Sequence, residues 1–238
     1  MEIIGFDGSL LIIRGNDKIK FLNGLTTNNI ENLNPKEPLK TVFTQRSAKI
    51  IDVVHCIHMN DFIAITGYRG HLQELLQHLK KQILNSDVQI SDVTDRNNFY
   101  RIISEEEPNF GINETVIWEG GEVWLVIVSA ANTLDATLTN EEWNAYRIKN
   151  MIPDYGHEIC PKFHPLAVGL QDLVHPAKGC YIGQEVLARM VSRQKQGRKL
   201  ILDNRESLNE NDITTYGEDY CLAVVKCLYP SMFFNCSL

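Results

Sequence analysis

The most regular pattern of apolar and polar positions lies between residues 72 and 83. Leucine or isoleucine recurs there at helical spacing, and mostly polar residues fill the positions between them. This pattern predicts an amphipathic helix, because residues three or four positions apart share one helix face. Shorter apolar runs bounded by turn-forming residues predict strands at residues 39–44, 50–57, 62–66, 88–93, 99–103, 199–202 and 220–228.

Turn dipeptides between apolar runs predict two hairpins. Asp7-Gly8 divides residues 3–13, and Gly120-Gly121 divides residues 115–128. Residues 23–38 instead carry five asparagines and two prolines, which predicts an irregular loop. A long loop in a compact domain often lines a functional site.

Three further helices are predicted from signals at their ends. One follows Asn16 and stops near Gly24, and another begins just after Gly183. The third starts near residue 141, where Thr139 and Glu142 have the spacing of a capping box.

A hairpin followed by a helix therefore occurs twice, at residues 50–84 and 115–149. This order predicts an α+β fold and indicates two duplicated halves. The length of 238 residues fits one large domain or two small ones.

The composition is that of an ordinary globular protein, with 44% hydrophobic and 22% charged residues. The net charge of −7 disfavours general binding to nucleic acids or anionic membranes. Apolar runs stay well short of the roughly 18 to 20 residues that span a bilayer. We therefore expect a cytoplasmic protein with no cleaved signal and no membrane contact.

The six cysteines are scattered along the chain without a C-x-x-C pair, which argues against a disulfide framework and against a zinc ribbon. His55, Cys56 and His58 offer three ligand types within four residues. In a strand, however, His55 and Cys56 point to opposite faces, and no second cluster supplies further ligands. We therefore expect no metal site.

One segment differs from the rest of the chain in charge. Residues 178–205 contain seven basic and two acidic residues, a local charge of +5, so the other 210 residues carry −12. A basic run is most often a solvated face, and the rest of the chain should repel a phosphate backbone. We expect no direct nucleic-acid binding.

The same segment contains an unusual string: Lys178-Gly179-Cys180-Tyr181-Ile182-Gly183-Gln184-Glu185. Its two glycines permit a tight turn, and the helix predicted after it would favour an anion at its N-terminus. The Cys180 thiol lies beside Lys178 and near that helix start, surroundings that stabilise a thiolate. Tyr181 offers an aromatic face, and the carboxylate of Glu185 suits two adjacent N–H donors. These groups indicate a cleft for a flat heterocycle with an anionic tail.

The string resembles the hallmark K-G-C-Y-x-G-Q-E of the YgfZ branch of the folate-binding glycine-cleavage T-protein superfamily. All seven defined positions are present between Lys178 and Glu185. Residues 146–159 are similar to the family stretch R-I-x-x-G-I-P-x-x-G-x-E-I, with Met151 where glycine is usual. Residues 14–26 are similar to the segment G-x-D-x-x-x-F-L-x-x-x-x-T, so the resemblance covers roughly residues 10–200.

The resemblance implies an α+β fold of duplicated ferredoxin-like, T-protein-like subdomains around a central tetrahydrofolate cleft. It places two intertwined halves at residues 1–190 and a curtailed C-terminal β-barrel-like segment at residues 191–238. It implies a role in assembling or repairing iron–sulfur enzymes and a connection to tRNA modification, with folate and iron–sulfur client or scaffold proteins as partners. We expect no enzymatic turnover in the ordinary sense.

The hallmark cysteine of the family corresponds to Cys180, which becomes the candidate active thiol. Lys178, Tyr181, Glu185, Arg189 and Asp52 are the candidates for contact with a folate.

Each of these residues also has a plainer interpretation. Cys180 is then a small buried residue, Lys178 a solvated lysine and Tyr181 a core aromatic. Glu185 favours the helix N-terminus by its charge, and Arg189 pairs or extends into solvent. Gly179 and Gly183 are expected to serve backbone geometry.

Two other functions stay open at this point. A folate-dependent aminomethyltransferase would need a carboxylate base near the folate nitrogen. T-proteins carry an acidic pair on the matching strand, whereas this chain has only Asp52 followed by Val53. A structural relative that binds no folate is the third possibility.

Overall fold

The structure is a computed structural model that describes residues 1–35, 37–193 and 195–227. Its strands are β1 (Glu2–Gly5), β2 (Gly8–Arg14), β3 (Leu39–Thr44), β4 (Ile50–Met59), β5 (Phe62–Tyr68), β6 (Gln89–Asp92), β7 (Asn97–Ile103), β8 (Thr115–Gly120), β9 (Val123–Ser129), β10 (Arg198–Asn204), β11 (Ile213–Thr215) and β12 (Tyr220–Lys226). Its α-helices are α1 (Lys18–Asn23), α2 (Leu72–Gln82), α3 (Asn140–Lys149) and α4 (Gln184–Ser192). Short 3-10 helices are η1 (Ile30–Asn32), η2 (Arg69–His71), η3 (Thr94–Arg96), η4 (Pro165–Val168), η5 (Gln171–Leu173) and η6 (Arg205–Ser207).

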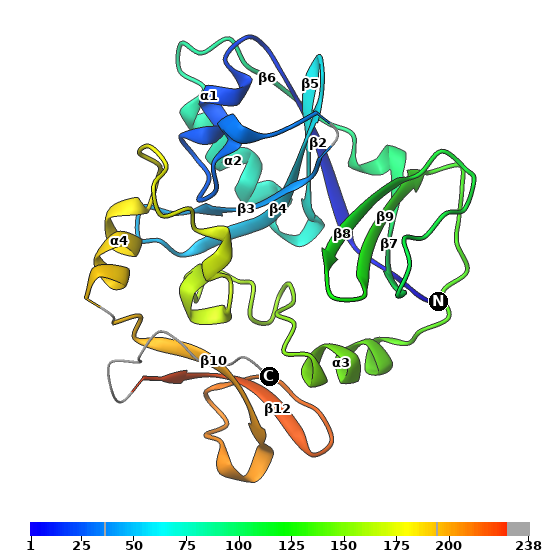
Figure 1. The fold of residues 1–238 in the computed structure, drawn as a ribbon, viewed down its shortest axis with the longest axis vertical. Coiled ribbons are helices and arrows are strands. Elements are labelled where there is room, and N and C mark those ends of the chain that lie inside the picture. Colours follow the sequence, from blue (N-terminus) through cyan, green and yellow to red (C-terminus); the bar gives the residue numbers. More distant parts are fainter. Residues whose placement is uncertain (36, 194, 228–238) are drawn as a thin grey trace. The chain divides into compact units, whose positions relative to one another are not determined.

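The strands form three sheets, with neighbours in the orders β1-β7-β9-β8, β3-β4-β5-β2-β6 and β10-β12-β11. Pairing is antiparallel in each of them, for example between β7 and β9, β2 and β5, and β10 and β12. Figure 1 shows these sheets with helices interspersed along the chain. The predicted α+β class is therefore confirmed.

The first predicted hairpin is wrong, although both of its strands exist. β1 pairs with β7, whereas β2 pairs with β5 and β6. The backbone N–H of Phe6 donates to the carbonyl of Phe99 at 2.9 Å. A Cβ on Gly8 would lie 2.4 Å from the Phe99 ring, so only glycine lets the chain pass this close. Asp7-Gly8 thus carries the chain from one sheet to another instead of folding it back on itself.

The other local predictions fare better. β8 and β9 form the second hairpin, with Gly120 and Gly121 at its turn in positive φ. At the start of α3, the Glu142 carboxylate accepts from the N–H of Thr139 at 2.9 Å, and the Thr139 hydroxyl accepts from the N–H of Glu142 at 3.2 Å. This reciprocal pair is the predicted capping box. β11 was not predicted, and the end of the strand predicted at 220–228 lies outside the described residues.

The chain divides into two compact units. Unit 1 comprises Met1–Phe21, Ile30–Lys40 and Val54–Tyr146, and unit 2 comprises Leu22–Asn29, Thr41–Val53 and the chain from Arg147 onward. The sequence analysis divided the chain at residue 190, between a T-protein-like region and a C-terminal β segment. That division rests on the family resemblance and stays a prediction, and so do the duplicated halves. The curtailed barrel also stays a prediction, because residues 228–238 lie outside the described part.

Each unit has its own apolar cluster. In unit 1 the cluster joins strands of two sheets, and its buried members are Ile12, Ile57, Ala64, Phe99, Ile117, Leu125 and Ile127. In unit 2 a smaller cluster contains Ala48, Leu166, Tyr181 and Leu187. Among the described residues, no helix combines the length and the hydropathy that crossing a membrane would require.

Candidate functional site

The predicted motif lies in unit 2, in a turn that leads into α4. Gly183 is the residue before the helix and has a φ of 90°, which favours glycine. The hydroxyl of Thr44 donates to the carbonyl of Ile182 at 2.6 Å. The glycine and this hydrogen bond fix the turn where α4 begins. Gly183 therefore serves backbone geometry, as the sequence predicted.

Cys180 is the one exposed cysteine among those that the structure describes. Cys56, Cys160 and Cys221 are buried, and Cys227 is half-buried. Burial raises the pKa of the Cys56 thiol to about 12, which makes its thiolate scarce. Solvent access therefore distinguishes Cys180 from the buried thiols, and the interpretation of Cys180 as a buried small residue is wrong. Cys236 lies outside the described residues.

The side chain of Lys178 is buried, with 7% of the residue's surface exposed. Its Nζ donates to the carbonyl oxygens of Asn23, Thr26 and Asn28, at 2.6, 2.6 and 2.8 Å. An ammonium group has three hydrogens to donate, and these three acceptors account for all of them. The interpretation of Lys178 as a solvated lysine is wrong.

Tyr181 is also buried and belongs to the apolar cluster of unit 2. Burial raises the pKa of its phenol to about 12, so the hydroxyl stays protonated at neutral pH. The Lys178 Nζ lies 5.0 Å from the centroid of the Tyr181 ring, a cation–π distance. The ring thus packs in the core and supports the lysine, as the plainer interpretation of Tyr181 expected.

Glu185 and Arg189 lie one turn apart on α4 and pair with each other. The distance from Arg189 Nη2 to Glu185 Oε1 is 2.6 Å, and both side chains are well exposed. Glu185 is also in the first turn of the helix, where a negative charge is favourable. Such an exposed pair stabilises a helix only slightly.

Asp52 lies in β4 and is fully buried. Its Oδ1 accepts from the backbone N–H of Val53 at 3.0 Å. The next residue, Val53, uses its carbonyl to accept from the hydroxyl of Tyr155 at 2.7 Å. The structure thus places Asp52 among the internal contacts of unit 2.

The predicted site residues are brought together only in pairs. Lys178 contacts Tyr181, and Glu185 contacts Arg189, within one turn and helix of unit 2. The Lys178 ammonium already has three backbone acceptors, and Glu185 and Arg189 already pair with each other. The predicted folate contacts of these residues, and of Asp52, stay predictions.

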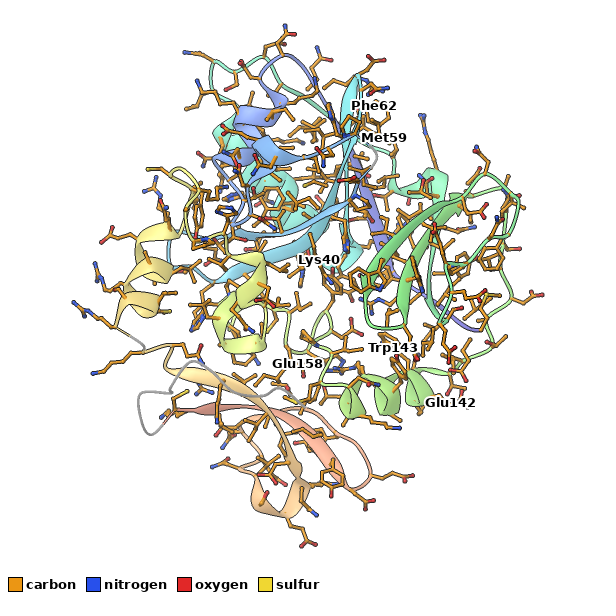
Figure 2. The ribbon with its side chains drawn as sticks, in the orientation of Figure 1. Lys40, Met59, Phe62, Glu142, Trp143 and Glu158 are labelled. Atoms are coloured by element: carbon orange, nitrogen blue, oxygen red, sulfur yellow. The ribbon has the colours of Figure 1, made fainter. Side chains whose placement is uncertain are left out.

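A buried ion pair in unit 2 was not among the predicted site residues, although both of its residues belong to the stretch that resembles the family. Arg147 Nη1 lies 2.9 Å from Glu158 Oε2, and both side chains are fully buried. The other Glu158 oxygen accepts from the hydroxyl of Thr215 at 2.8 Å and from that of Thr214. Glu158, labelled in Figure 2, therefore ties the segment after α3 to strand β11.

Unit 1 contains a second polar cluster that the sequence did not reveal. Arg101 Nε lies 3.1 Å from Glu119 Oε2, and both side chains are largely buried. The Arg101 guanidinium lies 5.1 Å from the centroid of the Trp143 ring. In Figure 2 Trp143 projects from α3 on a different side from Glu142.

His55 is coupled to this cluster of unit 1 by charge. Burial, together with the charge of Lys40, lowers the pKa of His55 to about 3, so its imidazole is neutral. Its Nε2 finds no hydrogen-bond partner in the part of the chain that the structure describes. Within those residues no three potential metal-ligating side chains group together.

Comparison with known proteins supports the resemblance found in the sequence. No family model matches the chain. A chloroplastic protein of Arabidopsis thaliana is 25% identical over 217 residues, which cover 76% of this chain and 50% of that protein. The tRNA-modifying protein YgfZ of Aliivibrio fischeri is 25% identical over 217 residues, covering 82% of this chain and 68% of that protein. This chain thus spans about half of the length of the plant relative.

A solved structure shows the same fold. The glycine cleavage system aminomethyltransferase T of Bartonella henselae matches with a TM-score of 0.73 at 12% sequence identity, covering 94% of this chain and 78% of that one. The sequence relatives and this fold together support the resemblance: the chain is similar in sequence to YgfZ-type proteins and has a GcvT-like fold.

Proposed function

We propose that the chain is a tetrahydrofolate-binding accessory protein for the assembly or repair of iron–sulfur enzymes, with the thiol of Cys180 as its active group. The observation that carries the proposal is the exposure of Cys180 within a turn whose neighbouring residues are anchored. A thiolate is both a nucleophile and a ligand for iron, and neither action requires a carboxylate base. The GcvT-like fold supports the folate part of the proposal.

The same proposal accommodates the name of the bacterial relatives, which are called tRNA-modifying proteins. An accessory protein acts on tRNA only through client enzymes that carry iron–sulfur clusters. Such a protein does not need to bind RNA itself, which agrees with the net charge of −7. We propose a cytoplasmic location and no membrane partner.

The first test of the proposal is the order in which the thiols react. With iodoacetamide at limiting concentration, we expect Cys180 to be alkylated at least about tenfold faster than Cys56, Cys160 or Cys221, because buried thiols react only after local opening. Mass spectrometry of the protein, in a Cys236→Ser background, measures the order directly. If a buried cysteine is labelled first, the exposed thiol is not the reactive one.

The second test separates folate binding from thiol chemistry. We expect Cys180→Ala to keep the tetrahydrofolate affinity of the natural chain within a few fold, since the side chain contributes chemistry and not the shape of a pocket. The same variant should fail to restore iron–sulfur enzyme activity in cells that lack their own relative of this protein. Calorimetry with millimolar folate and a complementation assay provide the two measurements.

Each part of the proposal has its own contradicting outcome in this test. No heat and no thermal shift with folate would remove the cofactor. Full complementation by Cys180→Ala would make the thiol structural, and the accessory mechanism would then be wrong. Cys227→Ala is the matched control, because it removes a half-buried thiol outside the motif.

The rival function is a folate-dependent one-carbon transferase with Asp52 as its base. The complete burial of Asp52 and its hydrogen bond to the next backbone amide disfavour direct action on a carrier-bound amine. Asp52→Asn distinguishes the two functions. The transferase should lose its activity in this variant, whereas the accessory protein should still complement provided that the variant folds.

A further inference from the structure

The ammonium of Lys178 fills a cage of backbone carbonyls. Its three acceptors belong to one short segment, residues 22–29, which is 150 to 155 positions away along the chain. Burying a charged amine is costly unless hydrogen bonds replace its water. The carbonyl dipoles of this segment, together with the ring of Tyr181, supply that replacement.

One hydrogen bond within residues 22–29 and two bonds to strand β3 hold the cage in shape. The Thr26 hydroxyl donates to the carbonyl of Leu22 at 2.9 Å, and the N–H of Thr27 donates to the carbonyl of Val42 at 3.0 Å. The N–H of Asn28 donates to the hydroxyl of Thr41 at 2.9 Å. The carbonyls of Asn23, Thr26 and Asn28 are thereby directed at a single point, where the Lys178 Nζ lies.

The far side of the motif is anchored to the same segment. The N–H of Ile182 donates to the carbonyl of Gly24 at 3.3 Å, and the Ile182 carbonyl accepts from the Thr44 hydroxyl at 2.6 Å. Tyr181, just before it, is buried in the apolar cluster. Gly179 and Cys180 are therefore an exposed two-residue span between two anchors.

We propose that Lys178 is a positioning residue, whose ammonium holds the motif onto residues 22–29 and so presents the Cys180 thiol in one orientation to a protein partner. This inference rests on the proposed function, in which Cys180 is the active group. It is an alternative to two expectations from the sequence, that Lys178 contacts the folate and that its charge activates the thiol. The hydrogen-bond geometry of the ammonium, and not its charge alone, is what the cage requires.

Three substitutions in the full chain test this role. Lys178→Met keeps the length and the apolar contact with Tyr181 but donates no hydrogen bond. Lys178→Arg keeps the charge, but its planar fork does not match three converging carbonyls. Lys178→Gln keeps two N–H donors and is used in place of Lys178→Met if the methionine variant does not fold. Lys199→Met is the matched control, because Lys199 is an exposed lysine.

Hydrogen exchange should report the loss of the cage. In Lys178→Met and in Lys178→Arg we expect the amides of residues 25–28 to exchange about tenfold or more faster than in the natural chain. Complementation should fall in both variants although Cys180 is intact. The rate of Cys180 alkylation by iodoacetamide should stay within about threefold of the rate in the natural chain at each pH, since the thiol is exposed in either case.

Chemical rescue distinguishes hydrogen bonding from charge. In Lys178→Ala, methylammonium should restore slow exchange of residues 25–28, whereas tetramethylammonium should not, because it has no N–H to donate. Wild-type exchange and complementation in Lys178→Arg would overturn the inference. So would a pH profile of alkylation that shifts in Lys178→Met and not in Lys178→Arg, which is the result expected of activation by charge.

Failure of the inference and failure of the proposed function are separable. If Cys180→Ala complements fully, the proposed function is wrong whatever Lys178 does. If Cys180→Ala fails and Lys178→Met complements with slow exchange, the function stands and the positioning role is wrong.

Discussion

Replacement of Glu158 by alanine is expected to lower the free energy of unfolding by about 3–5 kcal/mol, the cost of leaving one partner of a buried ion pair without the other. The Arg147 guanidinium is fully buried and 2.9 Å from Glu158. Its Nη2 also donates to the hydroxyl of Thr215 at 2.5 Å. Without the carboxylate, the positive charge of Arg147 loses its closest negative partner in a place that water does not reach.

The effect should extend to strand β11, because Glu158 accepts from the hydroxyls of both Thr214 and Thr215. Urea unfolding of the full chain measures the loss, and hydrogen exchange localises it to β11. Glu185→Ala is the matched control, since it breaks an exposed ion pair between residues one helical turn apart. It should lower the free energy of unfolding by less than about 0.5 kcal/mol.

A double variant tests the cause. Arg147→Leu and Glu158→Leu are made singly and together; the double variant removes both charges, so its loss should be smaller than the sum of the two single losses. If the single losses simply add, or if Glu158→Ala unfolds at the same urea concentration as the natural chain, the ion pair does not hold this region together.

The sequence predicted the elements whose signals are local. Helix α2 followed from its apolar spacing, and the start of α3 followed from Thr139 and Glu142, which need no contact outside one turn. The hairpin at Asp7-Gly8 failed because its turn signal is equally satisfied by a chain that crosses between sheets. The partner of β1 is β7, almost one hundred residues later, and nothing in residues 3–13 specifies it. Strand β11 has only three residues, too few for an alternating pattern.

The candidate site shows the same division. The tight turn before α4 and the glycine at residue 183 followed from the motif, because both are properties of the local chain, whereas the exposure of Cys180 was not predicted. The position of the Lys178 ammonium did not follow, because its acceptors are backbone carbonyls and every residue carries one. The sequence pattern of residues 23–38 predicted an irregular loop, in which the structure places the short helix η1, but it gave no sign of which carbonyls are directed at Lys178.

Substitution of Gly183 by alanine is the second change with a large expected effect. The residue has a φ of 90°, where a side chain is strained by about 1–2 kcal/mol. A Cβ there would also lie 2.6 Å from the Thr44 hydroxyl oxygen and 2.8 Å from the Gln45 carbonyl oxygen. Relieving such overlaps in a packed region typically costs about 1–3 kcal/mol, so the free energy of unfolding should fall by about 2–5 kcal/mol in total.

The same substitution should disturb the motif, because the Thr44 hydroxyl that it displaces donates to the carbonyl of Ile182. Gly179→Ala is the matched control within the motif. A Cβ on Gly179 meets no described atom within 4 Å, so the control should change stability by less than about 0.5 kcal/mol. Urea unfolding of both variants, with hydrogen exchange of the α4 amides, makes the comparison. Equal stability of the two variants would mean that α4 can begin without glycine, and that Gly183 is required in the motif for something other than backbone geometry.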